Sequence, residues 1–127
     1  MKALLDTSFF VATESGRPLR SMGGVTETEV SVITVAELTV GVLMANDADR
    51  PVRLSTLSAV ESTWDPLPVD VEVARQFARI VAALRTGRRR VPILDALVAA
   101  TAIVEQIPVV TQDDDYDAIP GVQVIRV

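Results

Sequence analysis

Four acidic residues of this chain lie in stretches that are otherwise rich in apolar residues. An ionised carboxylate removed from water costs several kcal/mol unless it is protonated, paired or bound to a metal. Cationic partners are scarce nearby, since the chain has one lysine, Lys2, and most of its arginines cluster elsewhere. A shared divalent cation is the simplest explanation. The candidate ligands, which would also be the catalytic residues, are Asp6, Glu37, Asp95 and Asp113.

The residue types that are absent limit which metal could bind and which catalytic mechanisms are possible. The chain has no histidine and no cysteine. Zinc is disfavoured, because its sites normally use imidazole or thiolate ligands, whereas carboxylate sites suit Mg²⁺ or Mn²⁺. Catalytic triads and other histidine-based mechanisms are excluded. Without cysteine there is no disulfide framework, so we expect a cytoplasmic protein.

Size and composition are those of one globular domain. The chain has 127 residues, of which 49% are hydrophobic and 23% charged, and we predict a single domain over residues 1–127. Asp6 interrupts the only apolar run near the N-terminus, and no run is long enough to cross a bilayer, so neither a secretory signal nor a membrane segment is expected. The net charge of −5 argues against a broad basic surface, although it permits a local one.

The elements that must position the acidic residues alternate between strands and helices. Apolar periodicity, capping residues and breakers predict strands at 2–5, 29–33, 67–69, 108–111 and 122–127. They predict helices from Thr7 or Ser8 onward and at 34–45, 52–63, 70–87 and 92–106, with loops at 15–28 and 112–121. This order indicates an α/β fold with a mostly parallel sheet covered on both faces.

In such a sheet, ligands gather at the carboxyl ends of the strands. Asp6 and Asp113 follow predicted strands, while Glu37 and Asp95 lie in the first turns of predicted helices, where the positive helix end favours ionised carboxylates. All four can therefore face one crevice. Ser8 and Thr111 are expected to support the site by orienting a carboxylate or a metal-bound water.

Each acidic residue also has a purely structural interpretation. Asp6 is a good N-cap residue. Thr34-Val35-Ala36-Glu37 matches a capping box, in which the glutamate bonds back to the start of its helix. The run containing Asp113 and Asp115 is typical of a solvated turn. Asp95 is the hardest to explain in this way, because the helix that it begins is apolar nearly all round.

The arginines are concentrated before the predicted helix at 92–106. Such a charge run is most often a solvated cluster. Its position just ahead of Asp95 makes phosphate binding the sharper alternative, because the planar guanidinium group matches phosphate well. The candidate RNA-binding residues are Arg85, Arg88, Arg89 and Arg90.

Four motifs taken in order resemble those of PIN-domain ribonucleases, and most closely the VapC toxins of type II toxin–antitoxin pairs. They are Leu4-Leu5-Asp6-Thr7-Ser8, Val35-Ala36-Glu37-Leu38, Asp95-Ala96-Leu97-Val98-Ala99-Ala100-Thr101-Ala102 and Val110-Thr111-Gln112-Asp113-Asp114-Asp115-Tyr116. The resemblance covers essentially the whole chain. It implies a PIN-like α/β/α sandwich with a central, mainly parallel sheet flanked by helices.

By this resemblance, Asp6, Glu37, Asp95 and Asp113 form an acidic quartet that binds one or two Mg²⁺ or Mn²⁺ ions. Asp115 falls on a further acidic position, and which of Asp113 and Asp115 lies nearer the ion stays open. The implied activity is endoribonuclease cleavage of RNA phosphodiesters through a metal-activated water. The alternative is a catalytically silent PIN-like scaffold that only binds a protein partner.

The resemblance also implies two protein contacts: a small VapB-like antitoxin and a second copy of the chain in a homodimer. An antitoxin of this kind lays a helix and an extended tail into a groove. The candidate groove is an apolar stripe, for which ordinary core is the competing interpretation. Its residues are Val40, Leu43, Met44, Leu54, Leu57, Val60 and Trp64.

Overall fold

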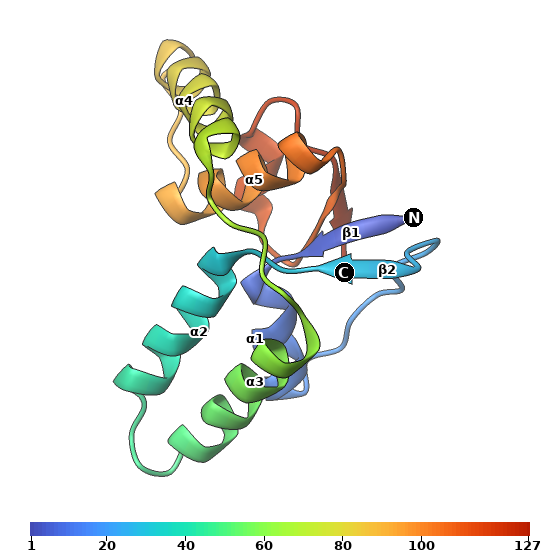
Figure 1. Cartoon of the computed structure of the whole chain (residues 1–127), viewed down its shortest axis with the longest axis vertical. Helices are drawn as coiled ribbons and strands as arrows, with labels where there is room; N and C mark the ends of the chain where they lie inside the picture. The colour runs from blue at the N-terminus through green and yellow to red at the C-terminus, as the bar shows by residue number, and fades with distance from the viewer.

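A computed structural model describes all residues 1–127 and contains one four-stranded sheet in which every neighbouring pair is parallel. The strands are β1 (Lys2–Leu5), β2 (Glu27–Glu29), β3 (Val109–Thr111) and β4 (Val124–Arg126), in the order β2-β1-β3-β4. The predicted α/β class with a mostly parallel sheet is confirmed (Figure 1).

Five helices and one 3₁₀ turn complete the chain. They are α1 (Thr7–Ser15), α2 (Val32–Met44), α3 (Arg50–Thr63), α4 (Val71–Thr86), α5 (Ile93–Glu105) and the turn η1 (Asp114–Ala118). In Figure 1, α4 and α5 lie on one side of the sheet and α1, α2 and α3 on the other. None of the helices is long and apolar enough to cross a membrane.

Two separate cores occupy the two faces of the sheet. Leu4 and Val109 pack into the core beneath α4 and α5, whereas Leu5 and Val110 pack into the core beneath α1, α2 and α3. Successive strand residues point to opposite faces, so a strand buried on both sides must be apolar at every position. The continuous apolar runs in β1 and β3 are therefore the signature of the two central strands.

The second strand and the helix after it begin earlier than predicted. The prediction of a strand at 29–33 is wrong, because β2 ends at Glu29 and α2 begins at Val32. Ser31 caps α2, and its hydroxyl accepts a hydrogen bond of 3.0 Å from the N–H of Ile33. The β-branched residues that suggested a strand lie in the first turn of the helix, where packing outweighs their strand preference.

Two further boundaries differ from expectation. The segment at 67–69 forms a single bridge, between Leu67 and Ser31, and not a strand. Helix α3 begins at Arg50 and contains Pro51 in its first turn, where proline is well tolerated because its missing N–H needs no partner there. The helix predicted at 52–63 therefore starts two residues earlier and includes this proline.

The strand order reverses between β1 and β3, which are hydrogen-bonded neighbours at the centre of the sheet. Asp6 directly follows β1, and Asp113 lies two residues beyond the end of β3. Parallel neighbours end at the same edge, so the chain brings these two residues to the position where open α/β sheets bind ligands.

Candidate metal centre

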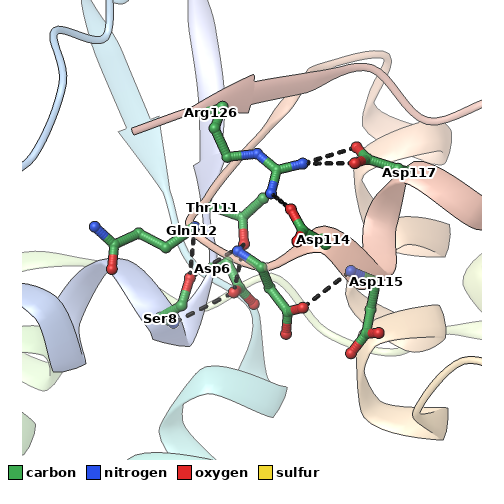
Figure 2. A network of polar contacts seen from close by, with 9 residues as sticks. Asp6, Ser8, Thr111, Gln112, Asp114, Asp115, Asp117 and Arg126 are labelled. Carbon is green, nitrogen blue, oxygen red and sulfur yellow. Dashed lines mark hydrogen bonds and ion pairs between the residues drawn. The ribbon is translucent and has the colours of Figure 1, made fainter.

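Asp6 is the N-cap of α1 and also the most tightly held carboxylate of the molecule. It is 3% exposed. One carboxylate oxygen, Oδ1, accepts a 2.8 Å hydrogen bond from the hydroxyl of Tyr116. The other, Oδ2, accepts one of 3.0 Å from the Thr111 hydroxyl and one of 3.3 Å from the N–H of Ser8 (Figure 2). The Asp6 side chain thus caps α1 and is also held in one orientation at the site.

The two predicted supporting hydroxyls form a chain with a defined direction. Ser8 and Thr111 are joined by a 3.1 Å hydrogen bond. Thr111 has one hydroxyl hydrogen, which it donates to Asp6, so Ser8 must be the donor in this bond. The backbone N–H groups of Gln112 and Asp113 donate to Ser8 and Thr111, respectively. These bonds tie the start of α1 to the segment that carries the acidic run (Figure 2).

The 3₁₀ turn η1 divides the acidic run into two sets. Side chains three residues apart are eclipsed in a 3₁₀ helix. Asp114 and Asp117 accordingly share one cation, Arg126, which makes two 2.8 Å bonds to Asp117 (Figure 2). Asp113 instead caps the turn by accepting a 2.9 Å bond from the N–H of Asp115. Arg126 therefore offsets the charge of Asp114 and Asp117 only, and the repulsion between the other aspartates of the run is not relieved by a basic side chain.

The other set of this run gathers around Asp95, in the first turn of α5. Carboxylate oxygens of Asp95, Asp113 and Asp115 all lie within 4.8 Å of one another, and Asp95 is 8% exposed. Burial, followed by the charges of Asp6, Asp113, Asp115 and Glu37, raises the pKa of Asp95 to about 7. Partial burial and the charge of Asp113 also raise the pKa of Asp115. The three residues form an acidic cluster that holds excess negative charge.

Glu37 borders this cluster from α2. It lies in the second turn of a helix that is capped by Ser31. The alternative interpretation of Thr34 to Glu37 as a capping box is therefore excluded, and the prediction that Glu37 lies in the first turn is wrong. Thr7 donates a 2.8 Å hydrogen bond to Glu37 Oε1. Burial raises the pKa of Glu37, and the charges of Asp6 and Asp113 add to it, although the Thr7 bond opposes them.

Tyr116 and Thr7 are two residues of the site that the sequence reasoning missed. Tyr116 is fully buried. Burial and the nearby Asp6 charge raise the pKa of its phenol, so the hydroxyl keeps its proton and donates to Asp6. The one available signal was an aromatic residue within a run of four aspartates, since a large apolar ring in a solvated turn has no use unless it packs inward.

A divalent cation fits these residues. The donor set consists of carboxylate and hydroxyl oxygens, which are the ligands that Mg²⁺ and Mn²⁺ prefer. No salt bridge involves Asp6, Glu37, Asp95, Asp113 or Asp115, while Arg126 is occupied by the other two aspartates. The predicted quartet is thus brought to one edge of the sheet, with Asp115 in close contact with Asp95 and Asp113.

The predicted RNA-binding arginines lie outside the acidic cluster. Arg85 is in the last turn of α4, and Arg88, Arg89 and Arg90 follow the helix. All four are exposed and line a hollow of 870 Å³ between α4 and the start of α5. They therefore neighbour the helix that carries Asp95 without taking part in its contacts.

The predicted apolar groove is divided by the structure. Leu57 and Val60 are buried and Trp64 is partly buried, and all three pack into the core beneath α1, α2 and α3. Val60 and Trp64 also line a hollow of 360 Å³ between α1 and α3. The indole N–H of Trp64 also donates a 3.0 Å bond to the carbonyl of Thr28. The remaining four residues are exposed on α2 and α3: Val40, Leu43, Met44 and Leu54.

Comparison with known proteins agrees with this architecture. The model of the PIN domain family matches residues 3–122. Ribonuclease VapC5 of Mycobacterium tuberculosis is 46% identical over 98% of this chain and 94% of its own length. Ribonuclease VapC4 of the same species is 40% identical over 99% of this chain and 97% of its own length.

A solved structure gives the same result in three dimensions. It is the crystal structure of VapBC-5 from Mycobacterium tuberculosis, described as a member of the VapBC family of toxin-antitoxin systems. The alignment has a TM-score of 0.89 at 42% identity and covers 99% of this chain and 98% of that one. The chain therefore belongs to the PIN domain family and, within it, to the group of proteins named VapC.

Proposed function

We propose that this protein is a Mg²⁺- or Mn²⁺-dependent endoribonuclease that acts as the toxin of a toxin–antitoxin pair. The observation that carries the proposal is the acidic cluster of Asp95, Asp113 and Asp115 beside the tethered carboxylate of Asp6. Its charge is not balanced by any basic side chain of the protein. The named ribonucleases that align over nearly the whole chain support RNA as the substrate.

The residues of the chain would divide the work as follows. Asp95, Asp113 and Asp115 would hold the cation, with Glu37 and Asp6 completing the negative environment. Thr111, Ser8 and Tyr116 would keep the Asp6 carboxylate in one orientation, since second-layer donors of this kind fix the ligand geometry. When bound, the cation would lower the pKa of a water and offset charge on the leaving oxygen of the phosphodiester.

The decisive experiment compares matched aspartate-to-asparagine variants in an RNA cleavage assay. We expect Asp6→Asn and Asp95→Asn each to reduce cleavage to the level seen with EDTA, because the amide keeps the side-chain volume but removes the charge. Asp114→Asn is the control, since Asp114 lies in the same acidic run but pairs with Arg126 outside the cluster. Cleavage at the wild-type rate by purified Asp6→Asn or Asp95→Asn would refute these assignments.

The same assay separates the enzyme from a silent PIN-like scaffold. Cleavage that requires Mg²⁺ or Mn²⁺ and stops with EDTA supports the enzyme. Absence of cleavage across several structured and unstructured RNAs, with the metal present, supports the scaffold. Mapping the 5′ ends of cellular RNAs after brief expression would then identify the RNA that is cut.

The proposal includes a protein partner with an apolar docking surface. The solved relative is described as part of a toxin-antitoxin system. On this chain, the C-terminal end of α2 exposes Leu43 at 73% and Met44 at 79%, and exposed apolar side chains that lie together often mark a protein–protein contact. We expect the product of a neighbouring antitoxin-like reading frame to co-purify with the chain, and the chain to form a homodimer. Leu43→Glu with Met44→Glu should weaken co-purification without lowering RNase activity.

A further inference from the structure

A hollow of the molecule lies outside the acidic cluster. It has a volume of 870 Å³ and is enclosed between the C-terminal half of α4 and the segment that runs back from α4 to α5. Figure 1 shows this segment descending beside α4 before α5 begins. Phe77 and Leu84 contribute to an apolar floor, and the rim consists of the four arginines at 85 and 88–90. The hollow thus combines an apolar base with a concentrated positive edge.

The charge of this rim is not used within the protein. The rim contains four of the chain's 12 cationic side chains, within a protein of net charge −5. None of the four makes a salt bridge or a side-chain hydrogen bond, whereas Arg50, Arg53 and Arg126 all do. A cluster of like charges is unfavourable by mutual repulsion unless an anion offsets it. The rim therefore matches an anionic ligand.

The backbone at the rim is strained at one of the four arginines. Arg88 has a φ of 55°, in the left-handed region, while the adjacent Gly87 has a φ of −80°. The chain closes here with a 2.7 Å hydrogen bond from the N–H of Arg89 to the carbonyl of Leu84. A left-handed arginine costs roughly 1–2 kcal/mol, and such costs concentrate at ligand sites.

The hollow adjoins the acidic cluster through the first turn of α5. Ile93 and Ala96 line the hollow, and Asp95 lies between them in the sequence but belongs to the acidic cluster. The two features are thus on different sides of one helical turn, whose diameter is about 10 Å. A flexible polyanion can pass over this turn and contact both. The N-cap residue Pro92 supplies no side-chain hydrogen bond to the free N–H groups of this turn.

We propose that this hollow binds single-stranded RNA beside the cleaved bond, with phosphates on the arginine rim and a base against the floor at Phe77. The inference rests on the proposed function and adds where the substrate is held. One divalent cation offsets only part of the charge of the acidic residues, so a separate cationic surface would strengthen the binding of RNA. An arginine-rimmed hollow with an aromatic side chain suits a phosphate together with an unstacked base better than an acidic peptide.

The test is a charge-reversal pair with a matched control on the same helix. Arg85→Glu with Arg89→Glu changes the rim, while Arg75→Glu with Arg79→Glu makes the same charge change on exposed residues of α4 that do not line the hollow. Cleavage of a labelled, unstructured RNA is measured over a range of salt concentrations. A milder pair, Arg85→Gln with Arg89→Gln, provides a second reading at lower risk to folding.

The rim variants should raise KM by about tenfold or more and leave kcat within about twofold, because they remove ground-state phosphate contacts remote from the reacting bond. The slope of log affinity against log salt should fall by about 0.7 for each phosphate that the rim no longer neutralises. The α4 control pair should change neither KM nor kcat by more than about twofold, if the RNA contacts are local to the rim.

Three outcomes would overturn the inference. Equal KM values for the rim and control variants would remove the hollow from RNA binding while leaving the proposed nuclease intact. An unchanged KM together with an altered molar mass by light scattering, or with loss of antitoxin binding, would assign the hollow to a protein partner. Absence of any cleavage by the wild-type chain would defeat the proposed function itself, which distinguishes it from the first two results.

Discussion

The Asp6 side chain shows how one residue can satisfy two interpretations that the sequence presents as rivals. It caps α1 through the N–H of Ser8, and it accepts hydroxyl hydrogen bonds from Thr111 and Tyr116. A buried carboxylate with three donors is held in one orientation at little desolvation cost. The structural and functional roles are therefore compatible, because the cap uses only part of the hydrogen-bonding capacity of the carboxylate.

Tyr116→Phe tests whether the buried hydroxyl positions Asp6. We expect the Mg²⁺ concentration for half-maximal cleavage to rise about tenfold, because loss of a second-layer donor typically weakens a metal site by about 10–100-fold. The loss of stability should be about 1 kcal/mol. Thr101→Ala is the control, since it removes another buried hydroxyl, one that bonds only to the carbonyl of Leu97. An equal change in metal requirement in both variants would reduce Tyr116 to a packing residue.

The left-handed Arg88 makes a prediction about stability. Arg88→Gly should be about 1 kcal/mol more stable than Arg88→Ala, because glycine adopts this conformation without a Cβ penalty. Urea unfolding of the two variants measures the difference. Both lose the same charge, so the comparison isolates the backbone. Equal stabilities would mean that the residue does not hold a φ of 55° in solution.

Helix α2 illustrates how an element boundary changes the meaning of a residue. With Ser31 as the cap, Glu37 lies beyond the turn in which a glutamate could bond back to the helix start. The start is determined by Val30 and Ser31, which are both fully buried beside the sheet. Glu37 is left to face Thr7 and the acidic residues, which places it at the site for reasons other than capping.

This position of Glu37 predicts different effects on stability for two variants of α2. Ser31→Ala should cost about 1 kcal/mol of stability, as loss of an N-cap does. Glu37→Gln should not destabilise the metal-free protein at neutral pH, because it removes a charge that burial and neighbouring acids disfavour. Thermal unfolding measures both, with Ser58→Ala on the exposed face of α3 as a control. Destabilisation by Glu37→Gln equal to that by Ser31→Ala would restore the capping box.

At the scale of the whole molecule, two packed cores and a parallel sheet hold acidic residues from distant parts of the chain against their mutual repulsion. Asp6 and Asp115 are far apart in sequence, yet both act on the pKa of Asp95. The folding free energy must therefore offset an electrostatic cost that a bound cation would remove. If the proposed cation binds here, the site gives up stability in the metal-free state in exchange for affinity toward that cation.

The pH dependence of stability follows from the raised pKa of Asp95. Between its unfolded value of 3.8 and its folded value of about 7, the folded state holds a proton that the unfolded chain has released. The contribution of Asp95 protonation to the free energy of unfolding is thus fully present below pH 3.8 and is lost as the pH rises through about 7. We expect the Tm of the metal-free protein to fall between about pH 5 and pH 8 and Mg²⁺ to reverse the loss.

Asp95→Asn provides the check on this assignment, because the variant has no proton to lose at this position. Its metal-free Tm should vary less over the same pH range and exceed that of the wild type at the upper end. Asp117→Asn is the control, since its carboxylate pairs with Arg126. A wild-type pH profile that Asp95→Asn leaves unchanged would assign the titration to another group.

Local sequence patterns are sufficient to predict the class of fold and most of the helices and strands. The apolar runs of β1 and β3 and the apolar helix after Pro92 could be predicted because burial on all sides leaves no other composition. The boundaries near Ser31 and Pro51 are predicted incorrectly. Proline disrupts the interior of a helix but is well tolerated in its first turn, and residues that favour strands can likewise occupy a first turn. Which of these cases applies depends on tertiary contacts, which a local sequence pattern does not contain.

For the site, the sequence identified the acidic residues from their apolar surroundings, and their order along the chain matched a known family. The division of these residues into two sets is seen only in the folded chain: Asp113 and Asp115 lie close to Asp95, whereas Asp114 and Asp117 pair with Arg126. The tertiary structure also revealed that Tyr116 holds Asp6. The physical reason is that carboxylate pairing and pKa values depend on distances of a few ångströms between residues over a hundred positions apart, which only the packed sheet brings together.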